Sequence, residues 1–171
     1  MQSGLPVKHF IAACNVNDVV SDYLQTHQWR PKQAVATLSN AMDVGNPSNF
    51  IRILEIFKHD FPEIKNKLSS CTITDKETEE TIKEVYQKYN YLLDPHGAVG
   101  ILALQRYLQE RPGEKGIFLE TAHPVKFPQA VEKITGKNID IPSSLTNLMQ
   151  ADKKSILLQP DYDMLKQFLL Q

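Results

Sequence analysis

The segment Val7–Cys14 constrains the fold most, because it is short and nearly continuous in apolar character. Such a segment is typical of a strand that is buried on both faces of a parallel sheet. Polar residues, Asn15, Asn17 and Asp18, follow it and lead into a short helix predicted over Val19–Leu24. Because open α/β sheets bind ligands just beyond the carboxyl ends of their strands, we expect a binding site here.

The remaining pattern alternates a few strands with many helices, which predicts an α/β fold. We expect a second clear strand at Gly116–Glu120 and a short one at Gln33–Leu38. Two or three strands make only a small, mostly parallel sheet flanked by helices, so we expect further strands to come from elsewhere. Helices are predicted over Pro47–Lys58, Pro62–Leu68, a segment begun by the capping box Thr74/Glu77, Pro95–Leu108 with Asp94 as its cap, Pro128–Thr135 ending at Gly136, Ser143–Met149 and Asp161–Leu170.

Composition indicates a single globular domain over residues 1–171, because 42% of the residues are hydrophobic and 23% are charged. The near balance of 19 Lys and Arg against 20 Asp and Glu gives no electrostatic case for binding nucleic acid or an anionic membrane. No apolar run approaches the roughly 18 residues that a membrane span needs. Cys14 and Cys71 are too few for a disulfide framework and their spacing predicts no metal site, so a cytoplasmic location is expected.

The loop Thr37–Phe50, with the sequence T-L-S-N-A-M-D-V-G-N-P-S-N-F, carries three asparagines, an aspartate, two serines and a glycine between apolar segments. Binding residues are often found on polar loops that a rigid scaffold holds in place. Asn46 and Pro47 are expected to begin the next helix, as its cap and in its first turn. From the residues alone, a turn with many capping side chains remains the alternative to a binding loop.

The chain carries four clusters in this order: Phe10–Asp18, Thr37–Asn49, Asp94–Val99 and Phe118–Phe127. In order and approximate spacing these clusters resemble those of threonine synthase, whereas the last thirty residues match only loosely. The resemblance implies a fold-type II enzyme dependent on pyridoxal phosphate (PLP), which converts O-phospho-L-homoserine and water to L-threonine and phosphate. The chain would be the C-terminal part of its catalytic domain.

The start of the chain agrees with this expectation, because Gly4-Leu5-Pro6 before the first strand looks like the end of a helix that the sequence does not contain. In the family, the phosphate-binding loop and the Schiff-base lysine lie upstream of the position matched by Phe10. We therefore expect no catalytic residue here and an inactive isolated chain, with the remainder of the enzyme as its partner. Lys126 lies beyond the cofactor-facing threonine, where a solvated or ion-paired lysine is expected.

Thr121 directly follows the predicted strand Gly116–Glu120. Its position alone favours a strand-end cap, whereas the resemblance implies that its hydroxyl bonds the pyridine nitrogen of PLP. His96 and His123 each adjoin a proline and are interpreted as structural histidines that backbone groups satisfy. The side chains expected to line the substrate pocket, although caps and turns use the same residue types, are Asn15, Asn17, Ser39, Asn40 and Asp43.

Two other functions stay open. A non-catalytic binding or interaction module could retain half of a PLP-enzyme fold. A different fold-type II enzyme, acting on serine or threonine, is disfavoured by the string S-N-A-M-D-V-G-N-P at residues 39–47.

Overall fold

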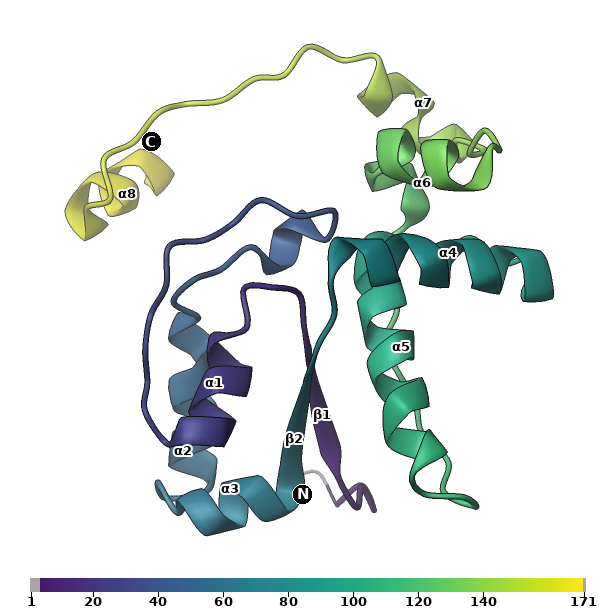
Figure 1. Cartoon of the computed structure of the whole chain (residues 1–171). Helices are drawn as coiled ribbons and strands as arrows, with labels where there is room; N and C mark the ends of the chain where they lie inside the picture. Colours follow the sequence, from purple (N-terminus) through teal and green to yellow (C-terminus); the bar gives the residue numbers. More distant parts are fainter. Residues whose placement is uncertain (1–3, 171) are drawn as a thin grey trace. The chain divides into compact units, whose positions relative to one another are not determined.

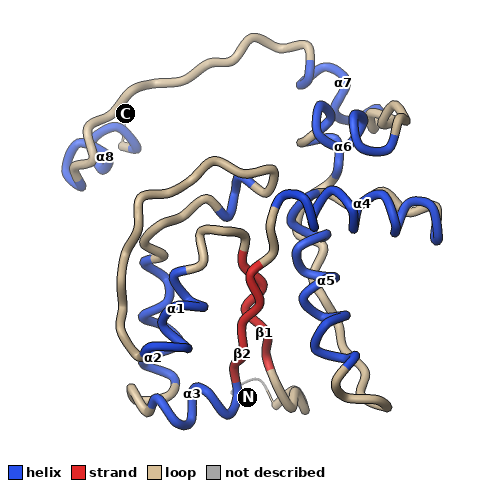
Figure 2. The backbone as a smooth tube through the Cα atoms, in the orientation of Figure 1, coloured by secondary structure: helices blue, strands red, loops and turns tan. Residues whose placement is uncertain are grey.

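Two parallel strands form the sheet in a computed structural model that describes residues 4–170. Strand β1 (Phe10–Cys14) pairs with β2 (Leu68–Thr72), so that Phe10 lies opposite Leu68 and Cys14 lies opposite Thr72. Within the described residues these are the two strands, drawn in red in Figure 2. The chain divides into two compact units, one ending at Ile139 and the other beginning at Asp140.

The first unit covers its sheet with helices on both sides. Helices α1, α2 and α3 lie on one side of β1 and β2, and α4 and α5 lie on the other (Figure 1). The helices and 3-10 turns of this unit are α1 (Val19–Thr26), η1 (Asn40–Met42), η2 (Ser48–Phe50), α2 (Ile51–Ile56), α3 (Phe61–Lys67), α4 (Asp75–Tyr89), α5 (Pro95–Gln109), η3 (Pro124–Lys126) and α6 (Pro128–Thr135).

Each helical layer has its own apolar core, because an amphipathic helix must bury its apolar face against a neighbour. The core on the α1 side contains Tyr23, Leu24, Phe50, Phe57, Ile64 and Leu68. The core between α4 and α5 contains Ile82, Val85, Leu93 and Ala98. This arrangement confirms the α/β class and the small parallel sheet flanked by many helices.

The second unit consists of α7 (Ser143–Met149) and α8 (Tyr162–Leu169), close to the predicted bounds. Asp161 caps α8 by accepting a hydrogen bond from the Met164 amide at 2.9 Å. None of the helices in the described part of the chain is long and apolar enough to cross a membrane.

The predicted strand Gly116–Glu120 is wrong, because this segment pairs with no other described segment. Its side chains Ile117 and Leu119 are 89% and 78% exposed. Gln33–Leu38 likewise forms no strand. A strand needs a neighbour to satisfy its backbone N–H and C=O groups, and apolar residues alone do not supply one.

Strand β2 went unpredicted, because L-S-S-C-T carries a weak apolar signal and Leu68 was expected to end a helix. Strand β1 begins at Phe10 rather than Val7, and its residues are half-buried or exposed rather than fully buried. A two-stranded sheet leaves both strands at an edge, which explains the incomplete burial.

Local capping signals were mostly reliable. Thr74 and Glu77 form the predicted capping box of α4, and Asp94 caps α5 with Pro95 in its first turn. The expected cap by Asn46 is wrong, because its Oδ1 atom accepts a hydrogen bond from Trp29 Nε1 at 3.3 Å instead. The helix predicted over residues 47–58 is accordingly split into η2 and α2.

Candidate functional site

Asn15 is the centre of a hydrogen-bond network at the carboxyl end of β1, and its side chain is almost completely buried. Its Nδ2 group lies 2.8 Å from Thr37 Oγ1, 2.9 Å from Asp43 Oδ1 and 3.1 Å from Ser39 Oγ. Its Oδ1 atom accepts the backbone N–H of Asn17 at 2.8 Å. A single buried amide therefore joins the strand end to the loop at residues 37–50.

Asp43 and Asn17 complete this network. The Asp43 carboxylate accepts both the backbone N–H of Thr37 at 2.9 Å and its hydroxyl at 2.7 Å. The Asn17 side chain accepts from the Val35 N–H at 2.7 Å and donates to the Val35 carbonyl at 2.9 Å. Because buried polar groups are costly when unpaired, these bonds hold the loop in one conformation.

The predicted pocket residues thus divide into two groups. Asn15, Asn17, Ser39 and Asp43 are brought together, whereas the Asn40 side chain is exposed and bonds no other described residue. Thr37, which the prediction did not include, is as central as Asp43. Its position at the start of the polar loop was the available signal.

A cavity of about 580 Å³ lies beside this network, which is within the usual range for small-molecule sites. Burial raises the pKa of the Cys14 thiol in its wall, so this cysteine stays protonated and is a poor nucleophile. No lysine is found among the described residues that line the cavity. They are Ala12, Ala13, Cys14, Asn15, Asn17, Val20, Met42, Val44, Pro47, Ser48 and Asn49.

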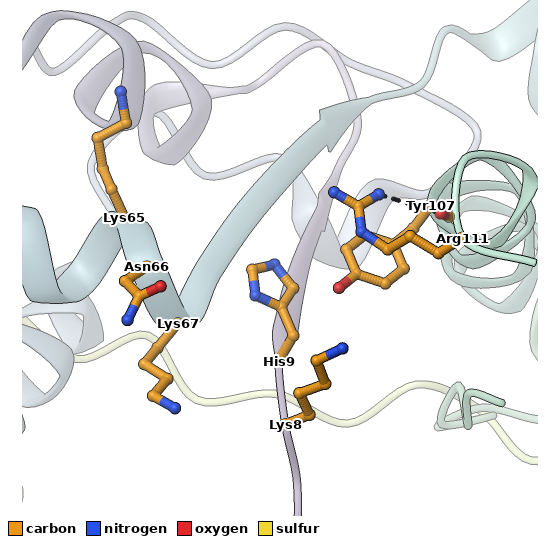
Figure 3. A pocket seen from close by; sticks show the side chains of 7 residues that line it. All are labelled: Lys8, His9, Lys65, Asn66, Lys67, Tyr107 and Arg111. Carbon is orange, nitrogen blue, oxygen red and sulfur yellow. Dashed lines mark hydrogen bonds between the residues drawn. The ribbon is translucent and has the colours of Figure 1, made fainter. Parts of the chain in front are cut away.

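A second cavity, of about 400 Å³, lies at the opposite end of the sheet between β1, the end of α3 and the end of α5 (Figure 3). Three of the four Lys and Arg side chains that line it already have a partner. Lys8 pairs with Glu114, and the Arg111 guanidinium lies 4.0 Å from the centre of the Tyr107 ring. The Lys65 side chain points away from the cavity in Figure 3, and its Nζ atom lies 5.8 Å from the centre of the Phe61 ring. The cavity at the carboxyl end of β1 is therefore the better candidate site.

The start of α5 contacts the loop through His96. His96 Nδ1 lies 2.6 Å from Asp94 Oδ1, and this same oxygen accepts the His96 backbone N–H at 2.8 Å. On the other side of the ring, the backbone N–H of Ala41 donates to His96 Nε2 at 3.1 Å. The His123 ring accepts the Val125 N–H at 3.1 Å. The His123 ring therefore has a backbone partner, as predicted, whereas the His96 ring has a backbone partner on one nitrogen and the Asp94 carboxylate on the other.

Glu120 lies against the same helix start. Its Oε1 atom accepts the Asp94 N–H at 3.4 Å, and a Cβ atom on Gly97 would lie only 2.2 Å from its Oε2 atom. Gly97 therefore permits the close approach of this carboxyl group to α5. Burial, together with the hydrogen bond to Asp94 and the charge of Asp94, raises the pKa of Glu120 to about 8.

The pKa of Asp94 is shifted in the opposite direction. Although its burial alone would raise the pKa, hydrogen bonds from Glu120 and His96 hold the pKa of Asp94 below its usual value. The two shifts together favour a protonated Glu120 carboxyl group beside an ionised Asp94 carboxylate. No sequence pattern indicated this pair, because the two residues are far apart in the chain.

Thr121 follows Glu120 and is exposed, with no side-chain hydrogen bond to another described residue. Its expected place at the end of a strand is wrong, because residues 116–120 form no strand. Thr121 is nevertheless the residue after Glu120, which contacts Asp94 at the start of α5. The same helix contacts the loop through His96. Lys126 is exposed, in agreement with a solvated lysine.

Comparison with known proteins gives one consistent family. The family described as "Threonine synthase, C-terminal" matches residues 97–169. Threonine synthase from Buchnera aphidicola is 43% identical over 168 residues, which are 98% of this chain and 38% of that relative. The Escherichia coli threonine synthase is 42% identical over 167 residues, again 98% of this chain and 38% of that relative.

Solved structures agree. The crystal structure of E. coli threonine synthase matches with a TM-score of 0.84 at 42% identity, covering 98% of this chain and 38% of that chain. The PLP-bound threonine synthase from Brucella melitensis matches with a TM-score of 0.77 at 29% identity, covering 97% of this chain and 40% of that chain. The chain therefore spans about two-fifths of the length of these relatives.

Proposed function

Since this chain belongs to the threonine synthase family and matches the C-terminal part of its members, we propose that it forms one wall of a PLP-dependent lyase active site. The reaction is the conversion of O-phospho-L-homoserine and water to L-threonine and phosphate. The observation that carries the proposal is the cavity beside the polar loop, which lies at the carboxyl end of β1 in a chain similar to threonine synthases over 98% of its length.

PLP, when bound, supplies an electron sink for carbanion chemistry. This chain offers the exposed hydroxyl of Thr121 as the donor to the ring nitrogen, which fits a group that needs one polar partner at that atom. The lysine that holds the cofactor is assigned to the remainder of the enzyme, because the family resemblance places it upstream of the position matched by Phe10. No catalytic residue is assigned to this chain.

The polar residues of the site have distinct roles in this proposal. Asn15 and Asn17 line the cavity, and because their amide groups already bond the loop, they shape the wall beside the substrate. Ser39 and Asp43 hold the loop through the Asn15 network and act on the substrate only through its position. Asn40 is exposed on η1, where it would bind only after the remainder of the enzyme covers it.

The remainder of the enzyme chain is the proposed partner of this chain. The two-stranded sheet and the exposed side chains of Ile117 and Leu119 support this, because large apolar side chains are normally covered by a neighbouring element. The cytoplasm is the proposed location, and the free thiols of Cys14 and Cys71 are typical of a reducing compartment.

The test uses the full-length protein that contains this chain, with PLP at saturating concentration. The variant Thr121→Ser keeps the hydroxyl and should retain most of the threonine-forming activity. The variant Thr121→Val keeps the shape but leaves the pyridine nitrogen of PLP without a donor. The loss costs on the order of 1–3 kcal/mol, which lowers the rate by about 10- to 100-fold. Thr146→Val, at an exposed position on α7, is the matched control and should leave the rate unchanged.

Two results would contradict these assignments. Equal rates for the Thr121→Ser and Thr121→Val variants would remove Thr121 from the cofactor site. A full-length protein that forms no threonine from O-phospho-L-homoserine would overturn the enzyme proposal and favour a non-catalytic module.

A further inference from the structure

The protonation state of His96 follows from its two partners. A backbone N–H can only donate, so His96 Nε2 must accept from Ala41 and carry no hydrogen. The proton of the ring therefore lies on Nδ1, where it points to the Asp94 carboxylate at 2.6 Å. Asp94 selects this tautomer, as a carboxylate partner commonly does for a functional histidine.

Asp94 is itself held in place by Glu120. The Oδ2 atom of Asp94 and the Oε2 atom of Glu120 are both buried, and neither has a hydrogen-bond partner in the described structure. A proton on Glu120 that is directed to Asp94 would satisfy both oxygens, and it would leave Asp94 as the acceptor that His96 requires. Phe127 packs beside the imidazole with a ring-centre distance of 4.9 Å, which limits the access of water.

The contacts from Glu120 through Asp94 and His96 lead to the loop beside the cavity. Ala41 lies in η1, and its neighbour Met42 lines the cavity. The Asn15 network holds the loop from the strand side, through Ser39 and Asp43. The His96 contact holds the same turn from the side of α5, and Asp75 of α4 also accepts the Leu38 N–H, so the loop is fixed at several places.

We propose that His96 is a positioning residue for the reaction, because its unprotonated Nε2 atom holds the Ala41 amide and so keeps the loop against the substrate cavity. This inference rests on the proposed function. His96 touches no reacting atom in this assignment, and it acts only through the loop. Asp94 orients its ring, and the protonated Glu120 keeps Asp94 in place.

Two substitutions in the full-length protein test the hydrogen bonds of the two ring nitrogens separately. His96→Gln places an amide oxygen near the position of Nε2 and can still accept the Ala41 N–H. His96→Asn places an amide group near Nδ1, so it keeps a donor to Asp94 but loses the acceptor for Ala41. The control is His59→Gln, because His59 is exposed and its ring pairs with Glu55 and with no other side chain in the described part of the chain.

Hydrogen–deuterium exchange of the peptide containing Ala41 is the first readout, and it does not depend on activity. We expect exchange at wild-type rates in His96→Gln and clearly faster exchange in His96→Asn. Steady-state kinetics is the second readout. We expect kcat/KM within about threefold of wild type for His96→Gln and reduced by about 10- to 100-fold for His96→Asn, because small displacements of a positioning loop are costly.

Equal exchange in the two variants would show that His96 does not hold the loop, even if the enzyme proposal is correct. Faster exchange in His96→Asn with unchanged kinetics would show that the contact has no role in the reaction. Absence of threonine synthase activity in the wild-type protein would instead contradict the proposed function, while the exchange experiment would still test the contact.

Discussion

Replacing Glu120 with glutamine should make the stability of the protein less dependent on pH. In the folded protein, burial and the neighbouring Asp94 raise the pKa of Glu120 from 4.5 to about 8. The folded state therefore holds one more proton than the unfolded state between these two pH values. This contribution to stability is complete below the unfolded pKa and is lost as the pH rises through the folded pKa.

The size of the effect follows from the pKa difference. Each unit of difference corresponds to about 1.4 kcal/mol in the free energy of unfolding. The full difference is an upper bound, because Glu120 is only partly buried and solvent screens its interaction with Asp94. We therefore expect wild type to lose on the order of 1–2 kcal/mol, relative to Glu120→Gln, between about pH 6 and about pH 9. The glutamine amide can donate to Asp94 throughout this range, so the variant has no such loss.

Chemical denaturation of the full-length protein, followed by circular dichroism, measures this difference when both proteins are compared at each pH. Glu79→Gln on the exposed face of α4 is the control, and its difference from wild type should not change with pH. Infrared spectra should also show a protonated carboxyl band near neutral pH that Glu120→Gln lacks. A pH-independent difference between wild type and Glu120→Gln, with no change in this band, would refute the protonated state of Glu120.

Two further substitutions test local features of the fold by the same denaturation assay. Gly45→Ala should destabilise by about 1–3 kcal/mol, because the new Cβ atom would lie 1.8 Å from the Lys32 carbonyl oxygen, whereas Gly100→Ala has room inside α5 and should be neutral or stabilising. Thr74→Ala removes the hydroxyl that accepts the Glu77 N–H and should cost about 1 kcal/mol, and an unchanged midpoint would show that the capping box contributes little.

Local signals were enough to locate most helices of this chain. The Thr74/Glu77 capping box, the Asp94-Pro95 start and the Gly136 end were all predicted correctly, because each depends on groups within one turn of the backbone. The resemblance carried by four short clusters also identified the family, since side-chain identity in order along the chain is information that the sequence holds completely.

The strands could not be predicted in the same way. Gly116–Glu120 has the apolar residues of a strand but no paired neighbour among the described residues, whereas L-S-S-C-T at 68–72 has few apolar residues and pairs with β1. Strand formation depends on a partner that is distant in sequence. The apolar pattern of one segment therefore cannot decide it.

The candidate site shows the same division between local and distant information. The sequence indicated that Asn15, Ser39 and Asp43 were unusual, but not that the first amide would bond both of the others. The contact of His96 with Ala41 joins residues 55 positions apart, and the contact of Glu120 with Asp94 joins residues 26 apart. Only folding brings such groups within hydrogen-bond distance, and burial there moves their protons, because the cost of an ionised group depends on what surrounds it.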